Sequence, residues 1–86
     1  DLMNSIEARD RGDRANRIIN DDLFLEAEQR LRASILQAFE RSRPEDVQAR
    51  ERAYLELTLL NRLIGDFKSL IASGTLAARN INEARK

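Results

Sequence analysis

The fold of this chain is decided by the stretch from Ala53 to Ile71, which reads AYLELTLLNRLIGDFKSLI. Apolar residues recur in it at alternating spacings of four and three, the spacing of a coiled-coil seam. The seam consists of Ala53, Leu57, Leu60, Ile64, Phe67 and Ile71. A second apolar row beside it consists of Leu55, Leu59, Leu63 and Leu70. This pattern predicts a long helix whose apolar surface is too wide for one neighbouring helix to cover.

We expect this long helix to occupy residues 43–74. Ser42 and Glu45 have the spacing of a capping box, and Pro44 between them is tolerated in the first turn of a helix. Gly74 fits the left-handed position that often follows a helix C-terminus. The tail from residue 75 to residue 86 therefore has weak predicted helical content.

A second helix is predicted at residues 20–42, with Asn20 as its N-cap. Glu26 with Arg30 and Glu28 with Arg32 are acid–base pairs that support it. The connection to the long helix is short, which favours an antiparallel hairpin. The second helix is roughly ten residues shorter than the long one and so leaves part of it uncovered.

Residues 1–19 predict a short N-terminal helix that leans on a neighbour. Glu7 with Arg11, Asp10 with Arg14, and Asp13 with Arg17 place each acid four residues before its base, an order that supports a helix. Gly12 opposes it by about 1 kcal/mol.

The composition restricts the fold to one all-α domain, residues 1–86, and restricts the chemistry as well. Strand patterns are absent, and hydrophobic residues make up 42% of the chain. The chain has no cysteine and no histidine, which excludes disulfides, thiolate metal sites and imidazole catalysis. The acidic pairs at residues 21–22 and 45–46 fit helix N-termini better than an active site. We therefore expect no enzymatic activity, no cofactor, no metal and no small-molecule substrate.

Charge and hydropathy also argue against nucleic acid and membrane as partners. The 15 basic residues balance 15 acidic ones and are interleaved with them, so no basic stripe is predicted. The longest uninterrupted run of large apolar residues is the three of Leu23-Phe24-Leu25, far short of a membrane span. We expect neither direct binding of nucleic acid nor a place in a membrane.

Two residues of the long stretch allow two interpretations each. Asn61 lies beside the seam, where it either fixes the register of an oligomer or occupies a solvated edge. Gly65 either permits a close helix approach or a bend, or is an unexplained cost of about 1 kcal/mol.

Three segments resemble a group of small helical proteins encoded in the head and DNA-packaging region of tailed bacteriophages and prophages. These segments are SRPED at residues 42–46, RERAYL at residues 50–55 and IASGTLA at residues 71–77. The resemblance covers residues 22 to 78. It implies a part in capsid assembly, genome packaging or the virion, in the host cytoplasm or the phage particle, through protein contacts and without an active site.

Our leading hypothesis is a phage structural or assembly protein that forms a homo-oligomer, or docks on other virion or packaging proteins, through the seam and Asn61. The alternatives are a small-terminase-like packaging adaptor that forms a helical ring, and a regulator that lays its amphipathic helix against a host protein.

Overall fold

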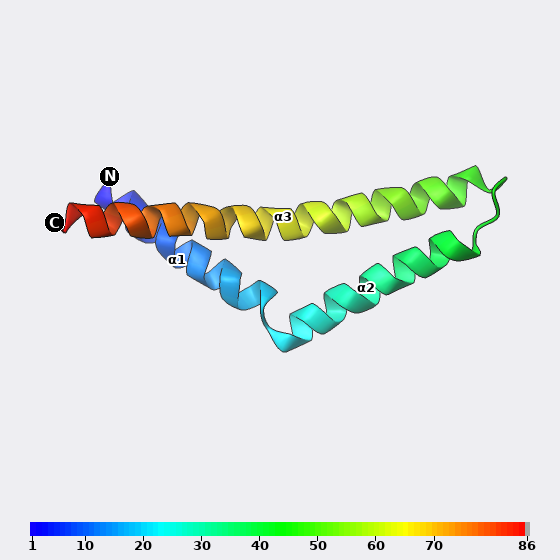
Figure 1. Ribbon diagram of the computed structural model, residues 1–86, viewed down its shortest axis with the longest axis horizontal. Helices are drawn as coiled ribbons and strands as arrows, with labels where there is room; N and C mark the ends of the chain where they lie inside the picture. The colour runs from blue at the N-terminus through cyan, green and yellow to red at the C-terminus, as the bar shows by residue number, and fades with distance from the viewer. Residues whose placement is uncertain (86) are drawn as a thin grey trace.

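A computed structural model describes residues 1–85, and these form three α-helices with no strand among them. Helix α1 spans Leu2–Ile19, α2 spans Asp22–Arg41 and α3 spans Val47–Ala84. The molecule is long and thin, 62 × 24 × 14 Å along its principal axes. The predicted all-α class, with a helical hairpin and a short N-terminal helix, is confirmed (Figure 1).

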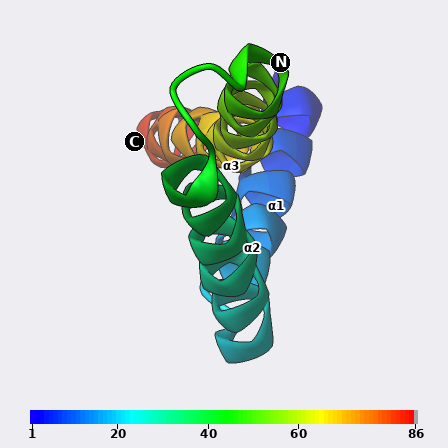
Figure 2. The same ribbon diagram turned by 90° about the vertical axis from the view of Figure 1, so that its right-hand side faces the viewer.

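The two shorter helices follow one another along α3, and both run antiparallel to it. Figure 1 shows the two chain termini at one end of the molecule and the loop between α2 and α3 at the other. Seen from that loop end, α2 lies alongside the first half of α3 while α1 lies further back (Figure 2). Helix α1 thus covers the half of α3 that α2 is too short to reach.

Helices α1 and α3 cross at two glycines. A Cβ atom built on Gly12 would lie 2.9 Å from the Cα of Gly74, and one built on Gly74 would lie 3.2 Å from the carbonyl oxygen of Ala8. Ala15 and Ala77 are buried beside this crossing. Small side chains at the contact let the two backbones touch, so the predicted cost of Gly12 within a helix is offset by close packing.

Gly74 does not end α3, contrary to the prediction. No glycine in the described chain has a positive φ, and α3 continues past Gly74 for a further ten residues to Ala84. Ala77 and Ile81, in the segment predicted to be a weakly helical tail, are buried. Packing under α1 stabilises this part of the helix, a tertiary contribution that local capping patterns do not contain.

Helices α2 and α3 share a small core. Its buried members are Ile35 of α2 and Ala53, Leu60 and Ile64 of α3, with Phe24 and Leu57 packed against them at partial exposure. The Phe24 and Phe67 rings meet edge to face, with their centroids 5.9 Å apart. This geometry suits the ring quadrupoles and closes the core near the elbow between α1 and α2.

The helix caps differ from the predicted ones. Asp21, rather than Asn20, is the N-cap of α2, and Asn20 instead ends α1. Asp46 is the N-cap of α3 and accepts a hydrogen bond from the Ala49 amide at 3.3 Å, so Ser42 and Glu45 form no capping box. The Ser42 hydroxyl donates to the Phe39 carbonyl at 2.6 Å and thereby serves the end of α2. In both cases a carboxylate nearer the helix, one residue after Asn20 and four residues after Ser42, satisfies the free amides and displaces the predicted cap.

Of the predicted acid–base pairs, the described residues contain one ion pair, between Glu28 and Arg32 at 3.0 Å. The three predicted pairs of α1 and the Glu26–Arg30 pair are not formed within residues 1–85. Exposed pairs of long side chains gain little from a fixed geometry, which explains their absence.

Candidate protein-interaction surface

The seam of α3 is occupied by the chain itself. Ala53, Leu60 and Ile64 are buried, and they belong to the core that α2 closes. Leu57, Phe67 and Ile71 are partly buried. These seam residues are therefore not free to contact another chain, because α1 and α2 together run the length of α3. A contact with another chain would have to use a different side of α3.

The N-terminal half of the second apolar row is uncovered. Leu55, Leu59 and Leu63 are 59%, 61% and 52% exposed, although each is a large aliphatic side chain. Leu70, the last member of the row, is partly buried. Three neighbouring turns of α3 thus present leucine to solvent, a surface that normally indicates an interaction site.

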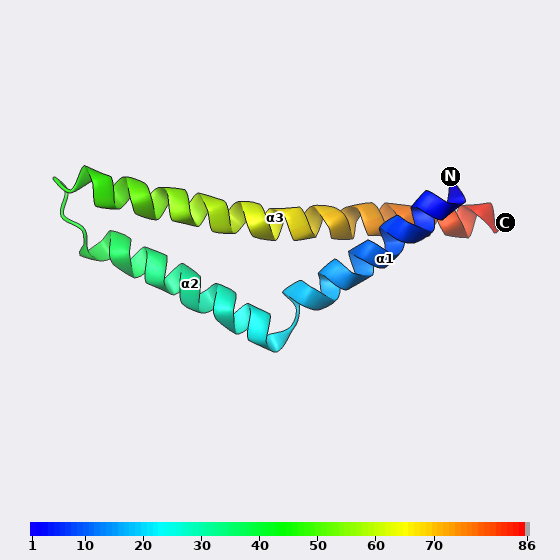
Figure 3. The ribbon, with the colours of Figure 1, turned by 180° about the vertical axis from the view of Figure 1, so that it is seen from behind.

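This row continues the face of α3 that α1 covers. With 3.6 residues per turn, Leu59 shares its side of the helix with Leu70, Ala77 and Ile81. Figure 3 shows α1 lying across the C-terminal half of α3 and turning away from it before the middle of the helix. One apolar face is therefore covered by α1 in its C-terminal half and open in its N-terminal half. We name the open half, Leu55, Leu59 and Leu63, the leucine face.

Four charged residues flank the leucine face: Arg52, Glu56, Arg62 and Asp66. All four are exposed, and none takes part in an ion pair with another residue of the described chain. A set of unpaired charges around an apolar strip is the usual composition of a protein contact, with an apolar centre and a polar rim.

Asn61 connects α3 to α2 within the chain. Its Oδ1 accepts a hydrogen bond from the Arg32 guanidinium at 2.9 Å, and the same guanidinium donates to Glu28 at 3.0 Å. Of the two interpretations of Asn61, the structure places it at an exposed edge, where it helps to align the two helices of the hairpin.

An apolar hollow lies between α2 and α3 near the connecting loop. It has a volume of about 220 Å³ and is lined by Ile35, Leu36, Phe39, Ala53, Tyr54 and Leu57. The Arg50 guanidinium lies 5.6 Å from the centre of the Phe39 ring, a cation–π distance. The lining contains almost no polar group, so this hollow can accept an apolar side chain but offers no reactive one.

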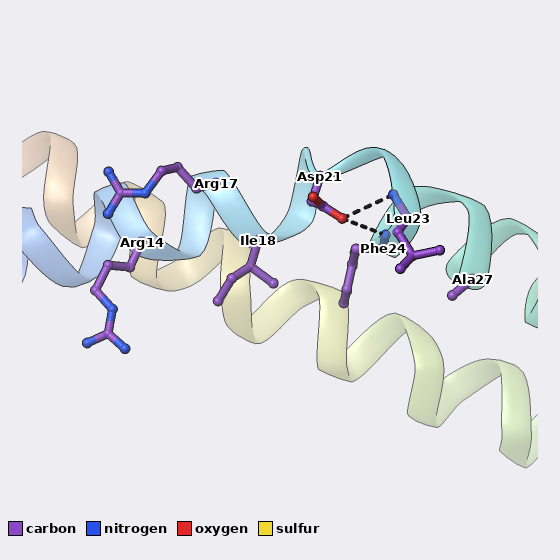
Figure 4. A pocket seen from close by; sticks show the side chains of 7 residues that line it. All are labelled: Arg14, Arg17, Ile18, Asp21, Leu23, Phe24 and Ala27. Carbon is purple, nitrogen blue, oxygen red and sulfur yellow. Dashed lines mark hydrogen bonds between the residues drawn. The ribbon is translucent and has the colours of Figure 1, made fainter.

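A larger hollow, at the elbow between α1 and α2, is open and not equipped for catalysis (Figure 4). Asp21 accepts hydrogen bonds from the Leu23 and Phe24 amides at 3.0 and 3.1 Å, which identifies its carboxylate as a helix cap. Figure 4 shows the Arg14 and Arg17 guanidinium groups extending away from Asp21. No acid, base and nucleophile converge there. Among residues 1–85, no three carboxylate, imidazole or thiol side chains are grouped as metal ligands.

Sequence reasoning missed the role of Gly12 and Gly74 and the pattern of the four flanking charges. Both glycines interrupt otherwise helical sequence, and that interruption was the available indication of a close crossing. None of the described helices has the length and apolar content that a membrane crossing requires. Comparisons of this chain with protein-family models, with curated proteins and with solved structures give no match.

Proposed function

We propose that this protein is a non-enzymatic assembly module that forms oligomers through the leucine face of α3. The observation that carries the proposal is the exposure of Leu55, Leu59 and Leu63 in successive turns on one side of α3, while its seam residues Ala53, Leu60 and Ile64 are already packed. Burial of each half-exposed leucine contributes about 1 kcal/mol, so a contact in which both chains bury this face gains several such contributions.

The size of the internal core supports the same proposal. Three of its buried hydrophobic residues are the alanines Ala15, Ala53 and Ala77, and no large side chain of the described chain is fully buried. A chain of 86 residues with no disulfide has few means of stabilisation beyond helix packing. Association would add apolar burial that the single chain lacks.

The setting of this assembly is proposed from the resemblance of residues 22 to 78 to small helical proteins of tailed bacteriophages. It is a virion or packaging complex, in the particle or the host cell, to which the module would contribute contacts between protein subunits.

Sedimentation velocity over a range from low to several hundred micromolar protein tests the proposal. We expect the chain to sediment as an oligomer that dissociates on dilution, and the triple variant Leu55→Gln, Leu59→Gln and Leu63→Gln to sediment as a monomer with unchanged helical content. Leu23→Gln is the matched control, because Leu23 is 72% exposed but lies on α2, and it should still associate. A wild-type chain that is monomeric at every concentration would overturn the proposal.

A further inference from the structure

The charges around the leucine face are arranged with opposite signs about Leu59. Arg52 lies seven residues before Leu59 and Asp66 seven residues after it. Glu56 lies three residues before it and Arg62 three residues after it. Leu55 and Leu63 lie four residues away on the two sides. Therefore, at each of these offsets, a leucine before Leu59 corresponds to a leucine after it, and a charged residue before Leu59 corresponds to one of opposite charge after it.

We infer that the leucine face binds a second copy of this chain, with the two α3 helices antiparallel and a two-fold axis passing beside Leu59 of both. An antiparallel pair centred there places residues of equal and opposite offset near one another. Arg52 of one copy then approaches Asp66 of the other, because both lie within about 20° of Leu59 around the helix, whereas Glu56 and Arg62 lie about 60° away on opposite flanks of the contact. Each end of the contact thus gains one Arg52–Asp66 pair beyond the paired leucines. This inference depends on the proposed oligomerisation and specifies its partner and geometry.

The same charges disfavour a parallel pair in register. In that arrangement Arg52 would face Arg52 and Asp66 would face Asp66, and like charges at a contact are unfavourable. All four residues are exposed and have no ion-pair partner within residues 1–85, so they are available to a second chain.

The position of α1 supports the antiparallel arrangement independently. A parallel partner would continue along the face that carries Gly74, where α1 is already in backbone contact. Val47 lies twelve residues before Leu59, and Ile71 lies twelve residues after it. In the antiparallel pair, the partner's Val47 therefore lies level with Ile71. The partner helix therefore begins close to the Gly12–Gly74 crossing, whereas a parallel partner would run past the crossing to the end of α3, along the face that α1 covers (Figure 3).

Charge reversal tests the pairing. Arg52→Asp or Asp66→Arg alone puts like charges together at both ends of the dimer, and we expect each to raise the dimer Kd by about tenfold. The double variant should return to the wild-type Kd, and so should an equimolar mixture of the two single variants. Lys68→Glu is the matched control, because Lys68 is exposed on the opposite side of α3, nine residues from Leu59, and its reversal should leave the Kd unchanged. Circular dichroism of each variant verifies that the helices remain.

Disulfide formation tests the orientation, since the natural chain has no cysteine. A Leu55→Cys chain mixed with a Leu63→Cys chain should cross-link to it in preference to itself, and a Leu59→Cys chain should cross-link to itself. If the wild type dimerises but the charge variants keep its Kd, or Leu55→Cys joins mainly to itself, the antiparallel pair is wrong while oligomerisation stands. If the wild type never dimerises, both are wrong, and the leucine face is left for a different protein.

Discussion

A Cβ atom on Gly12 would lie 2.9 Å from the Cα of Gly74 and 2.9 Å from the carbonyl oxygen of Leu70. Both neighbours are backbone atoms, which cannot move aside as the end of a flexible side chain can. The contact between α1 and α3 therefore requires glycine at both positions, and it fixes where α1 ends along α3. Because the end of α1 lies beside Phe67 and Leu70, the leucine face is left open.

Replacing Gly74 by alanine should destabilise the protein. The added methyl group would meet the Cα of Gly12 at 2.9 Å and the Ala8 carbonyl oxygen at 3.2 Å, so the helices must separate. Overpacking of this kind costs roughly 1–3 kcal/mol, and better helix propensity returns at most about 1 kcal/mol, so a net loss is expected. Urea unfolding followed by circular dichroism, at a protein concentration low enough for a monomer, measures the change. A Gly74→Ala variant as stable as the wild type would show that the crossing is looser than described.

Replacing Gly65 by alanine should have the opposite effect. A Cβ atom there meets nothing within 4 Å, and Gly65 is an exposed interior residue of α3. Alanine should stabilise the helix by about 1 kcal/mol through its propensity alone. Since both glycines lie in α3, the same unfolding measurement compares them directly. A loss of stability in Gly65→Ala would indicate a bend or contact that this position does not have in the structure.

Removal of the Asp46 carboxylate should weaken the start of α3. It is the N-cap of α3 and accepts from the Ala49 amide, so Asp46→Ala should lower the free energy of unfolding by about 1 kcal/mol. Glu45→Ala, one residue earlier, removes an equal charge without a capping bond and serves as the control. Equal losses in the two variants would favour a general effect of negative charge over the cap.

The neighbouring residues Ile64 and Leu63 should respond oppositely in two assays. Ile64 is 8% exposed and lies in the core with Ile35, so Ile64→Ala should lower the free energy of unfolding of the monomer by roughly 2–4 kcal/mol. Leu63 is 52% exposed, so Leu63→Ala should leave the stability of the monomer nearly unchanged. The same substitution should raise the Kd for self-association. Unfolding and sedimentation of both variants provide the comparison. An Ile64→Ala variant with wild-type stability would contradict the placement of the core.

The sequence predicted the helices better than their ends. Apolar spacing located α2 and α3, because burial of one face is a periodic property of the chain, and the spacing of opposite charges located α1. The N-cap of α2 was misplaced by one residue, at Asn20 instead of Asp21, and that of α3 by four residues, at Ser42 instead of Asp46. Several polar residues stand at each of these helix starts, and the local pattern does not choose between them. The end of α3 was misplaced at Gly74, because the neighbouring sequence does not distinguish a glycine that permits close packing from a glycine that ends a helix.

The sequence by itself determined the all-α class, the antiparallel hairpin and an apolar surface on α3 wider than one helix can cover, since these follow from residue spacing along a regular helix. Only the tertiary structure decided which part of that surface is covered. The seam packs against α2, and α1 covers the face of Gly74 and Ala77 but not that of Leu55 and Leu59. The crossing point of two helices depends on how closely their backbones can approach, and two glycines sixty-two residues apart set that distance only when the chain has folded.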